Sequence, residues 1–109
     1  MNLDVHAFGL SLSDPLALHI HKRIESALRP FRKAVAGITA RLTDINARRG
    51  GIDKQCSLVV VLHHQASVVV QGLHSDAYRS VDQAAGRLRS ALSRAVNRHK
   101  WHEQSRRRS

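Results

Sequence analysis

The fold is decided by a stretch in the middle of the chain, CSLVVVLHHQASVVVQ at positions 56–71. Its first half alternates apolar side chains with others, so that four of them share one face of a strand: Cys56, Leu58, Val60 and Leu62. A polar turn at 63–65 separates this strand from a second apolar run at 68–71. Two such runs joined by so short a polar link predict an antiparallel hairpin.

C-terminal to the hairpin, the sequence predicts a long helix. Ser75 or Asp76 is its expected N-cap, and the helical pattern continues to about His99. At about 100° per residue, one face is apolar and consists of Val81, Ala85, Leu88, Leu92 and Val96. The opposite side is polar and basic, and consists of Arg79, Gln83, Arg87, Arg94 and Arg98.

A first helix is predicted in the N-terminal third of the chain. Asp14 is the expected N-cap, Pro15 suits the first helical position, and Pro30 ends or kinks the helix. Its apolar face repeats every three or four residues and consists of Leu16, Ile20, Ile24, Ala27 and Phe31.

Alternating residues predict two more strands, over 1–8 and over 38–43. A loop over 46–53 carries the sequence RRGG at its tip, residues 48–51. The resulting order is β-α-β-β-β-α. We therefore predict an α+β two-layer sandwich, in which a four-stranded antiparallel sheet has two helices packed on one face, similar in build to a double-stranded-RNA-binding domain.

Length and composition predict one cytoplasmic domain. The chain has 109 residues, enough for a single domain, which we place at 1–104, followed by a disordered basic tail at 105–109. No apolar run approaches the roughly 18 residues of a membrane span, and the first residues lack the pattern of a secretory signal. The single cysteine, Cys56, suits a reducing compartment.

The positive charge is the strongest indication of function. Eighteen Lys and Arg against eight Asp and Glu give a net charge of +10, which favours a polyanionic partner such as nucleic acid. Of this charge, +7 lies between Arg79 and Ser109. The alternative is a solvated basic surface, but such helix faces usually mix both signs. Trp101 fits either stacking on a base or packing against the edge of the domain.

The sequence predicts neither an enzyme nor a cofactor site, and no small-molecule substrate. It has no glycine-rich nucleotide loop, no Gly-x-Ser-x-Gly and no Cys-x-x-Cys. His63, His64 and His74 are the candidates for a metal site with Cys56. Because neighbouring strand residues face opposite ways, we predict no metal site and expect Cys56 to be a small buried apolar residue.

Two segments resemble one protein family. They are DAYRSVD at 76–82, which opens the basic last helix, and a strand-loop-strand that runs from RLTDIN at 41–46 to RGGIDKQC at 49–56. The order of elements and HIHKRI at 19–24 match more loosely. Over nearly its whole length the chain resembles the ribosome hibernation-promoting factor and ribosome-associated translation inhibitor family, also called sigma-factor modulation proteins, in its short form.

The resemblance implies a non-enzymatic protein that occupies the mRNA and tRNA channel of the small ribosomal subunit. It would block initiation and promote ribosome hibernation under stress or in stationary phase. Tyr78 would pack the helix on the sheet, and Asp76 and Asp82 would be structural. His19 and Ser26 depart from family positions that are often aromatic and lysine. The residues expected to meet ribosomal RNA are Lys22, Arg23, Arg29, Arg79, Arg87, Arg94, Arg98 and Lys100.

Two other functions are compatible with the charge alone. One is a general double-stranded RNA binder, which would take any sufficiently long duplex. The other is an interaction module for an acidic protein partner, such as a transcription factor. A homodimer formed through an edge strand of the sheet is a further possibility.

Overall fold

The structure is a computed structural model that describes residues 2–45 and 53–108, with side chains as far as Arg98. Its elements, in chain order, are β1 (Asn2–Phe8), α1 (Asp14–Leu28), the 3₁₀ helix η1 (Arg29–Ala34), β2 (Val35–Asp44), β3 (Lys54–Leu62), β4 (Val68–His74) and α2 (Ala77–Arg108). The predicted order β-α-β-β-β-α is confirmed. The tip of the loop at 48–51 lies outside the described residues, and the division of the chain at residue 104 stays a prediction.

The four strands form one sheet in the order β1-β2-β3-β4. β2 pairs antiparallel with β3, and β3 with β4, so the predicted hairpin is confirmed. β1 runs parallel to β2, and the prediction of an antiparallel sheet was wrong at this edge. The reason is the crossover: α1 carries the chain back along the sheet, so β2 starts at the same end as β1.

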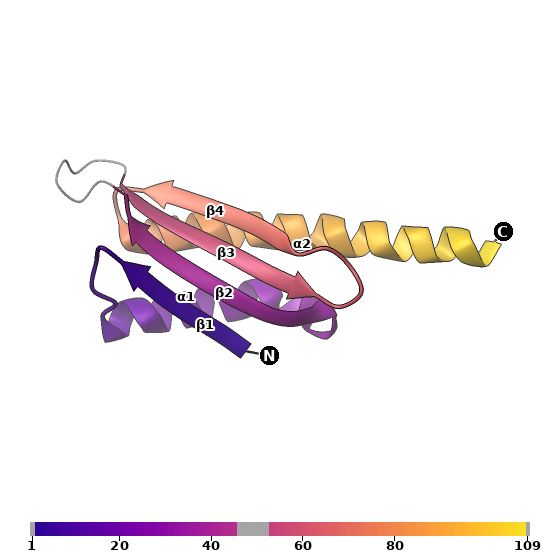
Figure 1. Cartoon of the computed structure of the whole chain (residues 1–109), viewed down its shortest axis with the longest axis horizontal. Helices are drawn as coiled ribbons and strands as arrows, with labels where there is room; N and C mark the ends of the chain where they lie inside the picture. The colour runs from indigo at the N-terminus through magenta and orange to yellow at the C-terminus, as the bar shows by residue number, and fades with distance from the viewer. Residues whose placement is uncertain (1, 46–52, 109) are drawn as a thin grey trace.

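Both helices cover the same face of the sheet (Figure 1). The core between the two layers takes its side chains from both helices and from the inward faces of the two central strands. All four alternating residues of the deciding stretch lie in this core, as predicted: Cys56, Leu58, Val60 and Leu62. The central residues of the apolar faces predicted for the helices are also inside, with at most 1% exposure at Ile20, Ile24, Leu88 and Leu92.

The start of α1 differs by one residue from the prediction. The N-cap is Ser13, whose Oγ accepts a hydrogen bond from the backbone N–H of Leu16 at 3.3 Å. Asp14 is the first helical residue, where its negative charge favours the positive end of the helix dipole. The helix ends at Leu28, and Pro30 lies in the 3₁₀ turn that follows, as its missing N–H and fixed φ require.

α2 lies very close to β4, and Gly72 makes this possible. A Cβ on Gly72 would overlap the carbonyl oxygen of Ser80 and lie 2.8 Å from the backbone nitrogen of Ala84. The two helix residues that face it are small and fully buried. β4 continues past the apolar run predicted at 68–71 and through Gly72 to His74, because a residue without a side chain can sit beneath the helix.

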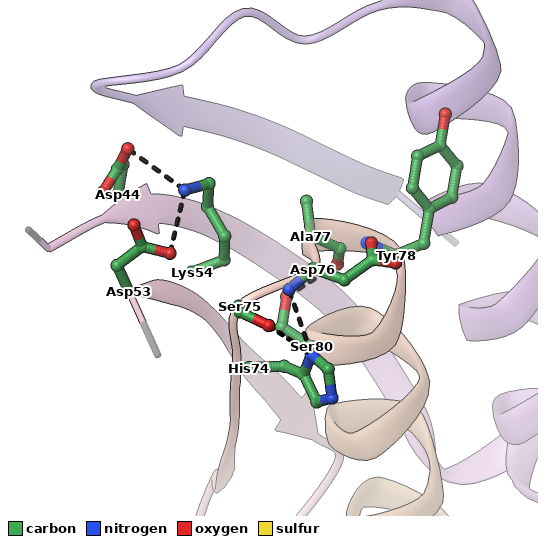
Figure 2. A network of polar contacts seen from close by, with 9 residues as sticks. All are labelled: Asp44, Asp53, Lys54, His74, Ser75, Asp76, Ala77, Tyr78 and Ser80. Carbon is green, nitrogen blue, oxygen red and sulfur yellow. Dashed lines mark hydrogen bonds and ion pairs between the residues drawn. The ribbon is translucent and has the colours of Figure 1, made fainter. Parts of the chain in front are cut away.

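α2 begins with the cap predicted for it. The Asp76 carboxylate accepts a hydrogen bond from the N–H of Tyr78 at 2.9 Å, and the N–H of Asp76 donates to Nδ1 of His74 at 3.0 Å (Figure 2). The helix then runs to Arg108, past the end near His99 that the sequence predicted, since neither glycine nor proline follows Gly86. Its C-terminal part extends beyond the sheet (Figure 1). No helix in the described part of the chain is long and apolar enough to span a membrane.

Lys54 connects the end of β2 to the start of β3, on either side of the loop between these strands. Lys54 Nζ lies 2.9 Å from Oδ1 of Asp53 and 3.3 Å from Oδ2 of Asp44 (Figure 2). Asp53 is buried, and its backbone oxygen accepts from the N–H of Ile45 at 2.8 Å. The hydrogen bond that Lys54 donates to Asp53 raises the pKa of Lys54 most, desolvation lowers it, and the hydrogen bond donated to Asp44 raises it further.

Candidate nucleic-acid interface

The outer surface of the helical layer carries the arginines of α2. Over residues 77–98, whose side chains the structure describes, this helix holds five arginines and a single acid, Asp82. Arg79, Arg94 and Arg98 are exposed and have no ion-pair partner among the described residues. Their guanidinium groups are therefore available to an external anion, and arginine pairs with phosphate through two parallel hydrogen bonds.

Arg87 and Gln83 turn toward the edge of the sheet instead of the far side predicted for them. The Nη1 of Arg87 donates to the carbonyl oxygen of Gln71 at 2.5 Å. The Oε1 of Gln83 accepts from the N–H of Leu73 at 3.0 Å. These two side chains satisfy outward-facing backbone groups of β4, which would otherwise be an open edge. Arg87 thus has a structural bond, and its remaining N–H groups are free to meet an anion.

A cleft of about 590 Å³ opens between β4 and α2. Two arginines line it, Arg87 and Arg94, together with Gly86 of the same helix. The residues that line it are Val69, Val70, Gln71, Gly86, Arg87, Ser90 and Arg94. The cleft is an open, basic groove along the helix.

On the opposite side of α2, a polar cluster joins it to α1. The Asp82 carboxylate lies 2.8 Å from Nε2 of His19 and 3.0 Å from Nε of Arg23. The ring of Tyr78 packs edge-on against His19, with 5.1 Å between ring centroids. Tyr78 and Asp82 therefore connect the two helices, although Tyr78 remains 39% exposed.

Arg23 also borders a second, smaller hollow between the helices. This hollow has a volume of about 110 Å³. Arg89 of α2 stands opposite Arg23, and Gly86 again forms part of the wall. The full lining is Arg23, Ser26, Ala27, Ala85, Gly86 and Arg89. The guanidinium group of Arg23 is paired through its Nε with the Asp82 carboxylate. Arg89 has no ion-pair partner among the described residues.

The remaining predicted residues of the first helix also face outward. Lys22 is exposed on α1, and Arg29 is exposed as the first residue of η1. Arg29 borders a third hollow of about 530 Å³ between η1 and α2, where Arg32 and Lys33 add two charges that sequence reasoning had not selected. Lys100 lies in α2, but its side chain falls outside the described part, as does that of Trp101.

Sequence reasoning missed two residues at the centre of this surface, Gly86 and Arg89. Arg89 was left out because it sits between the basic side and the apolar face on a helical projection. The position of α1 decides that it points into the groove between the helices. Gly86 was missed because it has no side chain that could mark it as a binding residue. The signal that could have found it is a glycine in the middle of a strongly helical segment.

The histidines and the cysteine do not converge. His63 and His64 lie in the turn between β3 and β4, and His74 lies at the other end of β4. Cys56 faces the core, where burial raises the pKa of its thiol to about 12. Among residues 2–45 and 53–98, no group of three or more His, Cys, Asp or Glu is placed to hold a metal ion.

Comparison with solved structures shows which known proteins share this fold. No protein-family model matches the chain, and no curated protein matches it. A ribosomal subunit interface protein from Coxiella burnetii is similar, with a TM-score of 0.76 and 20% identity over 89% of this chain and 99% of that one. The N-terminal domain of Protein Y from Thermus thermophilus has a TM-score of 0.70 and 19% identity over 86% and 98%. The chain thus has the α+β fold of the ribosomal subunit interface protein and of the Protein Y N-terminal domain, which is the fold that the resemblance in its sequence implied.

Proposed function

We propose that this protein binds the small ribosomal subunit through the outer surface of its helical layer. The observation that carries the proposal is the placement of Arg79, Arg94 and Arg98: all three are exposed, and none has an ion-pair partner in the described part of the chain. Phosphates of ribosomal RNA supply the missing partners, and each contact releases counterions from the RNA.

The fold supports the choice of a ribosome as the partner. A solved structure of similar fold is described as a ribosomal subunit interface protein. On this proposal the protein acts without catalysis, in the cytoplasm, by occupying the mRNA and tRNA channel. It thereby inhibits initiation and keeps ribosomes idle under stress or in stationary phase.

The surface that meets the RNA includes the residues of both helices. On α1 and after it these are Lys22, Arg23 and Arg29, and on α2 they are Arg79, Arg87, Arg94, Arg98 and Lys100. The position of Arg89 beside Arg23 adds it to this set. Because Gln83 and Arg87 cover the outer edge of β4, a homodimer that forms by strand pairing would use β1.

Co-sedimentation through a sucrose gradient tests the proposal. Wild-type protein is expected to travel with purified small subunits, and Arg94→Glu/Arg98→Glu to remain at the top. Arg41→Glu is a control of the same chemistry, because Arg41 is exposed on β2, on the face of the sheet away from the helices. If only Arg41→Glu loses binding, the subunit binds the face of the sheet that carries Arg41, and the proposed surface on the helices is wrong.

A second arm of the experiment separates the alternatives. Binding to a free RNA duplex as tight as binding to small subunits would replace the ribosome with a general double-stranded RNA as the partner. If the protein binds neither the duplex nor the small subunit at low salt, both RNA hypotheses fail, and an acidic protein becomes the candidate partner.

A further inference from the structure

Gly86 occupies a position where folding does not require glycine. It is exposed in the middle of α2. A Cβ placed on it would meet nothing within 4 Å in the described structure, in contrast to Gly72, where a Cβ would overlap the helix backbone. Glycine inside a helix is less stable than alanine, because it loses more backbone freedom on folding. The packing of the protein therefore offers no reason for the missing side chain.

The surroundings of Gly86 do offer one. Gly86 lines both the cleft between β4 and α2 and the hollow between α1 and α2. Gly86 is thus the residue that the two hollows share. Arg87 and Arg94 stand on one side of this point, and Arg23 and Arg89 stand on the other.

The charges at this point fit a chain of phosphates. Arg94 and Arg89 have no ion-pair partner among the described residues. Arg87 is oriented by its bond to the carbonyl oxygen of Gln71, so one end of its guanidinium is fixed and the other is open. The acid of the described part of α2, Asp82, lies about one helical turn before Gly86 and is paired with His19 and Arg23.

We propose that one strand of ribosomal RNA crosses α2 at Gly86, with its sugar-phosphate backbone against the bare helix. Phosphates on one side of the crossing meet Arg87 and Arg94, and phosphates on the other side meet Arg23 and Arg89. A side chain at position 86 would hold the strand away from the helix and lengthen all four contacts together. This inference rests on the proposed function and specifies where the RNA lies.

Two substitutions at this position test the crossing. Gly86→Ala is expected to raise the melting temperature by about 2–6 °C, because it removes the cost of a helical glycine, and to weaken binding to small subunits. Gly86→Leu introduces a larger side chain that also favours the helix, so the protein is expected to stay folded. This variant is expected to weaken binding at least tenfold. Ala36→Leu is the control, since Ala36 is exposed in β2 and lies outside both hollows.

The outcomes separate this inference from the proposed function. If Gly86→Leu binds as tightly as wild type while Arg94→Glu does not, the strand does not cross at Gly86, and the proposed surface stands. If Ala36→Leu weakens binding as much as Gly86→Leu, the effect is not specific to the crossing and the inference is wrong. If Arg94→Glu also binds as tightly as wild type, the proposed function fails and the crossing fails with it.

Discussion

Replacing Gly72 by alanine should destabilise the fold far more than the same replacement at Gly37, the other glycine of the described sheet. The new Cβ would overlap the carbonyl oxygen of Ser80, and it would lie 2.8 Å from the nitrogen of Ala84 and 3.0 Å from Cβ of Gln83. Two of these neighbours are helix backbone, so no rotamer change relieves the overlap. α2 must shift outward from β4.

The magnitude follows from what that shift breaks. Overpacking of this kind costs about 1–3 kcal/mol. Moving the helix also weakens the bonds from Leu73 to Gln83 and from Arg87 to Gln71, each of which contributes about 1 kcal/mol. We therefore expect a loss of about 3–5 kcal/mol in the free energy of unfolding.

Urea denaturation measures this loss, with Gly37→Ala as the matched control. A Cβ on Gly37 would approach only the carbonyl oxygen of Asn2, at 3.9 Å, so this variant should stay within about 1 kcal/mol of wild type. If Gly72→Ala is as stable as Gly37→Ala, α2 does not lie against β4 as closely as described, and the reasoning about this contact is wrong.

Three further predictions concern other parts of the molecule. Because burial raises the pKa of Cys56 to about 12 from 9.0, the unfolded thiol ionises first. Stability present below pH 9 should fall by up to about 4 kcal/mol as the pH rises toward 12. Alkaline unfolding should be less steep in Cys56→Ala, with a remaining contribution from Lys54, whose pKa is also raised. An unchanged slope would contradict the burial of the thiol. Asp82→Asn breaks the ion pairs with His19 and Arg23. The Asp82 side chain is 43% exposed, so solvent screens both pairs. The substitution should cost less than about 1 kcal/mol of stability and strengthen RNA binding; weaker binding would show that Asp82 positions Arg23 for the RNA. Ser13→Ala removes the N-cap of α1 and should cost about 1 kcal/mol in thermal unfolding, whereas Ser11→Ala, exposed before the helix, should cost little.

Most of the architecture could be predicted from local patterns. Alternation placed Leu58 and Val60 in the core, and the helical period did the same for Ile20, Ile24 and Leu88. These predictions succeed because each pattern depends only on which residues share a face. The predicted direction of β1 relative to β2 was wrong. This direction depends on the path of the chain through α1, which no pattern within β1 records.

The candidate site was predicted less completely, for a related reason. Periodicity showed that Arg94 faces away from the core, and this is confirmed by its exposure. Periodicity placed Arg87 on the far side of the helix and left Arg89 between the basic side and the apolar face, but the directions of both side chains are decided by the neighbouring elements. β4 draws Arg87 to the carbonyl of Gln71, and α1 forms the hollow into which Arg89 projects.

The central claim is that phosphates of the small subunit bind the arginines of the helical layer. The most direct test is the affinity for purified small subunits across a salt series, for wild type, Arg94→Glu and Arg41→Glu. The account predicts that wild-type affinity falls steeply with salt, and that Arg94→Glu lowers the slope of log K against log salt by about 0.7–0.9, one phosphate contact. Arg41→Glu should leave the slope nearly unchanged. A wild-type affinity that is independent of salt, or an equal loss in Arg41→Glu, would contradict the account.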